Sequence, residues 1–190
     1  TNAGCMYVSP GEGAFPGDAN LDGATNILDA VMVVEFIFGT LGIPMTDIGF
    51  INADLSNDGV LDILDLVAMV DVILETPARL QDATIASVLV TGDVVSLESD
   101  GYVGAVQITL THGSDFSIDL SESAFVSGYH TEGNTTQVIM VNPTSELFTV
   151  TGDFDIDEVI AANAEGYIDV NIYDEMSYSI TSCLLYTSPS

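Results

Sequence analysis

Basic residues are almost absent from this chain of 190 residues. Arg79 is the single basic residue against 29 aspartates and glutamates, which gives a formal net charge of −28 at neutral pH. A protein that binds nucleic acid needs a basic surface to displace the counterions of the phosphates. Anionic membrane surfaces also attract basic segments. The composition therefore excludes nucleic acid as a partner and argues against anionic membrane surfaces.

Long hydrophobic runs are absent as well. The run VMVVEFIF, residues 31–38, is short and contains Glu35, whereas a membrane span needs about 18 apolar residues. Strong charge is typical of disordered chains, but 47% hydrophobic residues and a mean hydropathy of +0.41 favour a folded protein. Salt-adapted proteins usually reduce their hydrophobic residues, so we infer that divalent cations neutralise the acidic side chains.

Cysteine is scarce and tryptophan is missing. Cys5 and Cys183 lie at opposite ends, and their spacing indicates no disulfide framework. The sequence begins at Thr1 without a signal-like segment, which we interpret as the result of processing or trimming. Residues 183–190, CLLYTSPS, contain no acidic residue and resemble the translation of a sequencing adapter. We expect the natural chain to differ after about Ser182, which would leave a single genuine cysteine.

Many of the acidic residues lie in a stretch that is repeated after 36 residues. The first copy reads GDANLDGATNILDA and the second NADLSNDGVLDILDL. Superposing Asp18 on Asp54 also aligns Gly23 with Gly59, and the triplet ILD follows in both copies. So many matches at one offset indicate two copies of one structural unit.

Each copy has the ligand pattern of a calcium loop. In a 12-residue loop, side-chain oxygens stand at positions 1, 3, 5, 9 and 12, position 7 gives a carbonyl, and glycine at 6 permits the turn. Crowded carboxylates suit a hard cation, which offsets their repulsion, so we predict two Ca²⁺ ions, one in each loop. The predicted ligands are Asp18, Asn20, Asp22, the carbonyl of Ala24, Asn26 and Asp29 in loop one, and Asp54, Ser56, Asp58, the carbonyl of Val60, Asp62 and Asp65 in loop two.

Each loop leads into an unusually apolar helix. Ten of the thirteen residues are apolar both in 26–38 and in 62–74, although a helix packed on one side needs only an apolar stripe. Either residues 1–16 or the following domain cover this excess, or the helices contact a partner protein. The residues that we predict to face such a partner are Ile27, Leu28, Val31, Ile63, Leu64 and Val67.

After the second helix the pattern changes to short strands. Val106, Ile108 and Leu110 alternate with polar residues, which is the period of a half-buried strand, and turn residues separate the runs as in a β-sandwich. We therefore predict an α+β chain with separate domains. The predicted parts are a lead over 1–16 that can add an extended strand to a neighbouring sheet, a small helical calcium domain over 17–76, a linker over 77–83, an antiparallel β-sandwich over 84–182, and the adapter-like end over 183–190.

The paired loop-helix repeats resemble a dockerin, the module that docks into cohesin domains. The resemblance covers about 60 residues and implies calcium and a cohesin-type partner. Cellulosomal dockerins commonly carry Ser or Thr as recognition residues at loop positions 10 and 11, where this chain has Ile27-Leu28 and Ile63-Leu64. The departure favours an apolar contact and leaves the identity of the partner open.

The β domain resembles a cohesin sandwich. The resemblance rests on GYVGAVQITLTHGSDFSIDL near its start and on ELFTVTGDFDIDEVIAANAEGYIDVNI near its end, within about 90 residues. A cohesin-like socket would therefore follow a dockerin-like plug on one chain.

Two functions of different classes fit these features. The first is an extracellular structural subunit whose plug docks into the socket of another copy, so that copies join head to tail into filaments. The second is a module that its dockerin tethers to a separate cohesin-type scaffold, while the β domain binds a carbohydrate or a cell surface. Millimolar calcium outside cells suits such loops, so in both cases we expect a secreted or cell-surface protein with no segment in the membrane.

Other candidate sites in the β domain are less specific. We predict no enzyme, because His112 and His130 lie in polar turns without a nucleophile nearby and the many carboxylates select no acid/base pair. Asp153, Asp155 and Asp157 could form a third calcium site or a solvated acidic face. The triplet Asn134-Thr135-Thr136 is a glycan acceptor sequence.

Overall fold

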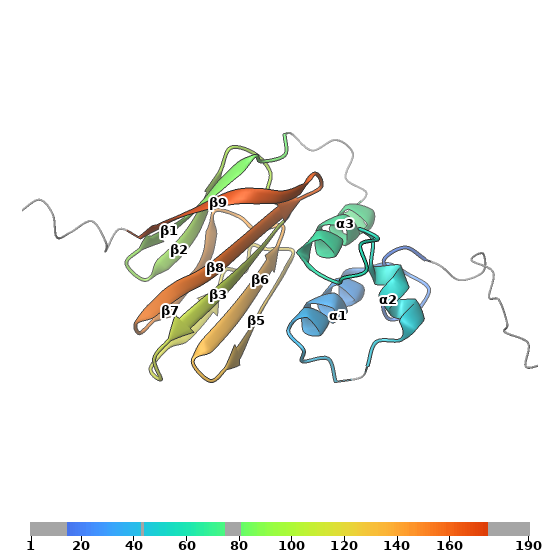
Figure 1. Ribbon diagram of the computed structural model, residues 1–190, viewed down its shortest axis with the longest axis horizontal. Helices are drawn as coiled ribbons and strands as arrows, with labels where there is room; N and C mark the ends of the chain where they lie inside the picture. Colours follow the sequence, from blue (N-terminus) through green and yellow to red (C-terminus); the bar gives the residue numbers. More distant parts are fainter. Residues whose placement is uncertain (1–14, 43, 75–80, 175–190) are drawn as a thin grey trace, which may run out of the picture. The chain divides into compact units, whose positions relative to one another are not determined.

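The structure, a computed structural model, describes residues 15–42, 44–74 and 81–174. The chain divides into two compact units, Thr1–Glu75 and Thr76–Ser190. Helices occupy the first unit and strands the second (Figure 1), which confirms the predicted α+β class. Most of the predicted lead and the whole adapter-like end lie outside the described residues.

Three helices form the first unit: α1 (Ile27–Ile37), α2 (Asp47–Ala53) and α3 (Ile63–Leu74). Helix α1 begins with a capping box, in which the Asn26 side chain accepts from the backbone N–H of Leu28 and the Asp29 side chain accepts from that of Asn26. This pairing satisfies N–H groups that have no partner within the helix. The start of α1 is therefore fixed to the end of loop one.

The core of the first unit lies between α1 and α3, which pack against each other. Ala30 and Val33 of α1 and Leu66 and Met69 of α3 are fully buried. These side chains recur every three or four residues, which places them on one face of each helix. Helix α2, which the sequence patterns did not reveal, begins after Thr46, whose hydroxyl oxygen accepts from the N–H of Gly49 at 3.0 Å.

Nine strands form the second unit. They are paired in the order β4-β7-β2-β1-β9-β8-β3-β6-β5, and every pair is antiparallel except β1 with β9. Their bounds are β1 (Ile85–Thr91), β2 (Val94–Ser99), β3 (Ala105–His112), β4 (Ser117–Leu120), β5 (Val126–Glu132), β6 (Thr135–Val141), β7 (Glu146–Thr151), β8 (Phe154–Asn163) and β9 (Gly166–Asp174).

The order of the strands makes two layers. Strand β9 pairs with β1 and, through its first residues, with β8, so it connects the layer β4-β7-β2-β1-β9 to the layer β8-β3-β6-β5. Figure 1 shows β8, β3, β6 and β5 side by side. Val88 and Phe148 from one layer belong to the same core cluster as Ile108 and Met140 from the other. The second unit is therefore a mostly antiparallel sandwich with an apolar core.

The second unit begins inside the segment predicted as a linker. Asp82 pairs with Tyr102, and the N–H of Ala83 donates to the carbonyl of Tyr102 at 3.0 Å. Ala83 belongs to the core cluster, and its carbonyl accepts from the side chain of Asn163 at 2.8 Å. Residues 82 and 83 are thus part of the sandwich.

No helix among the described residues is long and apolar enough to cross a membrane.

Candidate metal centre and docking surface

The first ligand position shapes both loops in the same way. The Asp18 carboxylate accepts from the N–H groups of Asp22 at 3.1 Å and Gly23 at 3.0 Å. In loop two, the Asp54 carboxylate accepts from the corresponding N–H groups of residues 58 and 59 at 3.2 and 3.0 Å. Both loops therefore curl around the side chain of their first aspartate.

The last ligand position closes each loop. The Asp29 carboxylate accepts from the N–H groups of Asn20 at 3.1 Å and Asn26 at 2.8 Å. The Asp65 carboxylate accepts from those of residues 56 and 62 at 2.9 and 3.0 Å. Asp29 and Asp65 have no exposed surface, and each is in the first turn of a helix. The two aspartates thus connect a loop to the helix that follows it.

Glycine at the sixth position is required by the backbone. Gly23 and Gly59 have φ angles of +91° and +86°, a region that costs other residues energy because of their Cβ atoms. Leu21 and Asn57, at the fourth position of each loop, are also left-handed, with φ of 63° and 58°. The repeated sequence therefore gives a repeated backbone.

Burial raises the pKa of Asp65, while hydrogen bonds from Ser56 and Asp62 oppose this rise. A buried carboxylate without a counter-charge favours its neutral form. A cation in loop two would favour the ionised form instead.

Helix α2 supports loop one from outside the ligand set. The side-chain amide of Asn52 donates to the carbonyl of Asp18 at 3.0 Å, and the N–H of Gly17 donates to the carbonyl of Asn52 at 2.7 Å. A Cβ at Gly49 would lie 2.4 Å from the carbonyl oxygen of Ala19, so only glycine permits this approach. The metal pattern alone gave no signal for Asn52 or Gly49, because neither supplies a ligand.

The donor chemistry of both loops fits Ca²⁺. Carboxylate, amide, hydroxyl and carbonyl oxygens are the ligands that this ion prefers, and all the predicted ligands belong to these types. Across residues 15–42, 44–74 and 81–174, no three His, Cys, Asp or Glu side chains are spaced to hold a metal ion, so the fit rests on the types of donor and not on their spacing. The carboxylates accept backbone N–H groups, and each oxygen has a further lone pair with which it can coordinate a cation.

The residues predicted to face a partner differ in exposure between the two repeats. Ile27, Leu28 and Val31 are 44, 61 and 38% exposed. Ile63 and Val67, at the equivalent positions of the second repeat, are 1 and 2% exposed, and Leu64 is half-buried. This corrects the prediction for Ile63 and Val67, because a buried side chain has no exposed area to offer a partner. Of the six residues predicted to face a partner, those with more than a third of their surface exposed lie on the first turns of α1.

Both histidines lie in strands rather than in turns. His112 ends β3, where its Nδ1–H donates to the carbonyl of Gly113 at 2.9 Å and its Nε2 shares a hydrogen bond of 2.8 Å with the hydroxyl of Thr136. Its ring stacks on Phe116 with centroids 3.9 Å apart. These contacts give His112 a structural role, and His130 lies within β5.

The acidic run at the start of β8 does not form a compact site. Asp155 and Asp157 are exposed, and Asp157 accepts from the Thr111 hydroxyl. The pairing with β3 is irregular at this point. Asn134 is exposed in the turn between β5 and β6, so its glycosylation remains a prediction that this geometry permits.

Comparison with known proteins gives one family match and one similar solved structure. Residues 16–74 match the family model of the dockerin type I domain. Among solved structures, the chain is similar to a non-cellulosomal cohesin from the hyperthermophilic archaeon Archaeoglobus fulgidus, with 19% sequence identity, a TM-score of 0.34, and coverage of 47% of this chain and 83% of that chain. No curated protein matches the chain.

Proposed function

We propose that this chain is an extracellular structural subunit that joins copies of itself, and the match of residues 16–74 to the dockerin type I domain supports this proposal. The helical unit of one copy docks on the sandwich of the next, and two Ca²⁺ ions, one in each loop, hold the docking unit in shape. Calcium outside cells is in the millimolar range that suits loops of this kind.

The observation that carries the proposal is the exposed apolar surface at the start of α1. Ile27, Leu28 and Val31 lie within two turns of a helix, and together they expose more apolar side chain than an isolated surface residue. Burial of apolar surface contributes about 25 cal/mol per Å². A rigid helix start with three such side chains is therefore suited to a protein contact.

Calcium and this surface are linked through Asp29. Its carboxylate closes loop one through Asn20 and caps α1 through Asn26, while Leu28 and Val31 lie on either side of it in the helix. Without a cation, the carboxylates of the loop repel one another, which opposes this arrangement. Docking should therefore depend on calcium.

Electrostatics distinguish self-assembly from docking on a basic scaffold. Two Ca²⁺ ions reduce the formal charge from −28 only by four, so copies of the chain still repel one another. Salt screens this repulsion, so self-assembly through apolar contacts should strengthen as sodium chloride rises. Docking on a basic partner would weaken under the same change.

A contact between unlike surfaces has a consequence for the form of the assembly. Helical unit and sandwich are different parts of one chain, so their contact is heterologous and either closes into a ring or continues as an open filament. We propose the filament.

The test is the double variant Leu28→Asp with Val31→Asp, compared with Ile51→Asp as control. Ile51 lies on α2 and is 68% exposed, so the control adds a charge to another apolar patch of the same unit. In millimolar calcium, electron microscopy should show filaments for the natural chain and the control but monomers for the double variant. Calorimetry should show two bound Ca²⁺ in all three.

Filaments of the double variant would contradict this interface. Monomers of the natural chain in calcium, with binding only to an added cohesin-type scaffold, would replace self-assembly by the tethered module.

A further inference from the structure

Strands β8 and β9 separate after a short paired start. They pair only through residues 161–163 of β8 and 166–168 of β9. Beyond this point β8 continues along β3 as far as Phe154, while β9 continues along β1 as far as Asp174. Among the described residues, no strand pairs with the facing edges of β8 from 154 to 160 and of β9 from 169 to 173. These two backbone edges are open to a further strand.

The core loses its cover along this separation. Ile168, near the paired start of β9, is 7% exposed, whereas Ile172, on the same side of the strand, is 45% exposed. In β8, Ala161 is buried, and Ile156 and Phe154 are only half-buried although they pack against the core. Apolar side chains that point inward therefore remain in contact with solvent.

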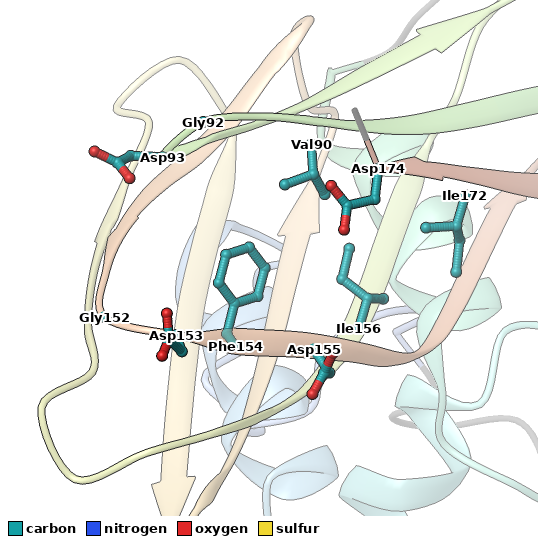
Figure 2. Close-up of a pocket in the computed structure, with 10 residues that line it drawn as sticks. All are labelled: Val90, Gly92, Asp93, Gly152, Asp153, Phe154, Asp155, Ile156, Ile172 and Asp174. Carbon is teal, nitrogen blue, oxygen red and sulfur yellow. The ribbon is translucent and has the colours of Figure 1, made fainter. Parts of the chain in front are cut away.

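Figure 2 shows the resulting cavity. Phe154 and Ile156 of β8 point toward Val90 of β1 and toward Ile172 and Asp174 of β9, across a space of about 430 Å³. The remaining lining residues are at its margin and include three aspartates: Asp93, Asp153 and Asp155. We call this space the β8/β9 gap. It combines apolar walls with two open strand edges, which is what an inserted strand needs.

We propose that residues 175–182 of a second copy of this chain insert into the β8/β9 gap as a strand. This stretch, EMSYSITS, alternates strictly, with Met176, Tyr178 and Ile180 separated by polar residues. Alternate residues of a strand lie on one face, so these three side chains would enter the gap together. Glu175 is the only charged residue of the stretch, so the rest of it approaches the marginal aspartates without repulsion.

The pattern favours a second copy over the same chain. Strand β9 ends at Asp174, which lines the gap, so residues 175–182 could enter their own gap only by reversing at once. A two-residue reversal directly after Asp174 would place Glu175 and Met176 at its centre, and neither is the Gly, Asn or Asp that such turns favour. The lead is a poorer occupant, because Cys5–Val8 is a continuous apolar run without alternation.

The insertion is a contact separate from the docking of the helical unit. None of the residues that line the gap belongs to a calcium loop, so the insertion should not depend on calcium. The inserted strand would add main-chain hydrogen bonds and apolar burial between two copies of the chain. This contact goes beyond the proposed function.

The experiment uses a fluorescent peptide of residues 175–182 and the full chain with Tyr178→Asp, which disables its own strand. Fluorescence anisotropy should show binding both in calcium and after EDTA. Adding Ile172→Asp to the receptor should weaken binding at least tenfold. Ile172 is already partly exposed, so this variant should keep the folded sandwich, which circular dichroism checks.

Assembly of the full chain supplies the second readout. Tyr178→Asp should reduce the sedimentation coefficient of assemblies in calcium, whereas Ser179→Asp, which adds the same charge on the other face of the strand, should reduce it less.

Peptide binding that fails, or binding of a peptide of residues 1–14 instead, would overturn the proposal. The proposal would also be overturned if the natural chain is a monomer that Tyr178→Asp destabilises. Residues 175–182 would then fill the β8/β9 gap of their own chain. The Leu28 and Val31 variant leaves peptide binding unchanged, so failure of this proposal is distinct from failure of helical docking.

Discussion

The two units of this chain place their charged residues in opposite ways. In the helical unit, Asp18, Asp29 and Asp65 are 2% exposed or less. In the sandwich the core cluster is apolar, and it includes Ile108 and Leu110, which are 1% exposed or less. Buried carboxylates cost free energy unless they are paired, whereas buried apolar side chains stabilise a fold by themselves. The first unit should therefore depend on a cation and the second should not.

The largest expected effect is the loss of the ligand that closes loop two. Asp65→Ala removes the acceptor of two backbone N–H groups together with a calcium ligand. We expect calorimetry to show one bound Ca²⁺ instead of two, and the helical signal in circular dichroism to melt at a lower temperature. Asp47→Ala removes the same charge from an exposed position in the first turn of α2, outside the loops, and should keep both sites and lower the melting temperature much less. A chain that keeps two sites after Asp65→Ala would show that this residue is no ligand.

A truncation in the sandwich should act without regard to calcium. Leu110 is fully buried in β3, and Leu→Ala in a core typically costs about 2–5 kcal/mol. Denaturant unfolding of Leu110→Ala should show this loss in calcium and in EDTA alike. The exposed control Ser127→Ala should stay within about 0.5 kcal/mol of the natural chain. A loss that appears only in EDTA would mean that the two units are not independent in stability.

A smaller effect should come from the ninth ligand position, where the two loops differ. Loop one has Asn26 there and loop two has Asp62, and both cap the following helix by accepting from the N–H two residues on. Asp62→Asn keeps this cap and removes one charge, so it isolates the effect of charge on affinity. We expect the tighter of the two sites to weaken by up to about tenfold. An unchanged titration would show that charge count does not set the difference between the loops.

Features set by a local sequence pattern could be predicted, whereas features set by tertiary packing could not. The loops could be predicted because all their ligands lie within twelve consecutive residues, and the same spacing occurs twice. The exposure of the two helices could not, because Val31 and Val67 follow identical local patterns and differ only in what surrounds them. Helix α2 was missed because seven residues give too short a pattern, and its cap at Thr46 is a weak signal by itself.

The strands also differ in whether a local pattern could predict them. The alternation of Val106, Ile108 and Leu110 predicted β3, but β5 was missed because its sequence, VSGYHTE, is mostly polar. Strand β5 is at the edge of the sheet, where fewer apolar neighbours are needed. The early separation of β8 from β9 depends on pairing between distant residues, which no local pattern reports.

Hydrogen exchange of the full chain, read by mass spectrometry in calcium and in excess EDTA, tests the central claim most directly. In calcium, peptides from both units should exchange slowly. In EDTA, peptides from residues 17–74 should lose their protection, while those from 81–174 should keep theirs. Protection of residues 17–74 that survives EDTA would contradict the account, because the helical unit would then hold its docking surface without calcium.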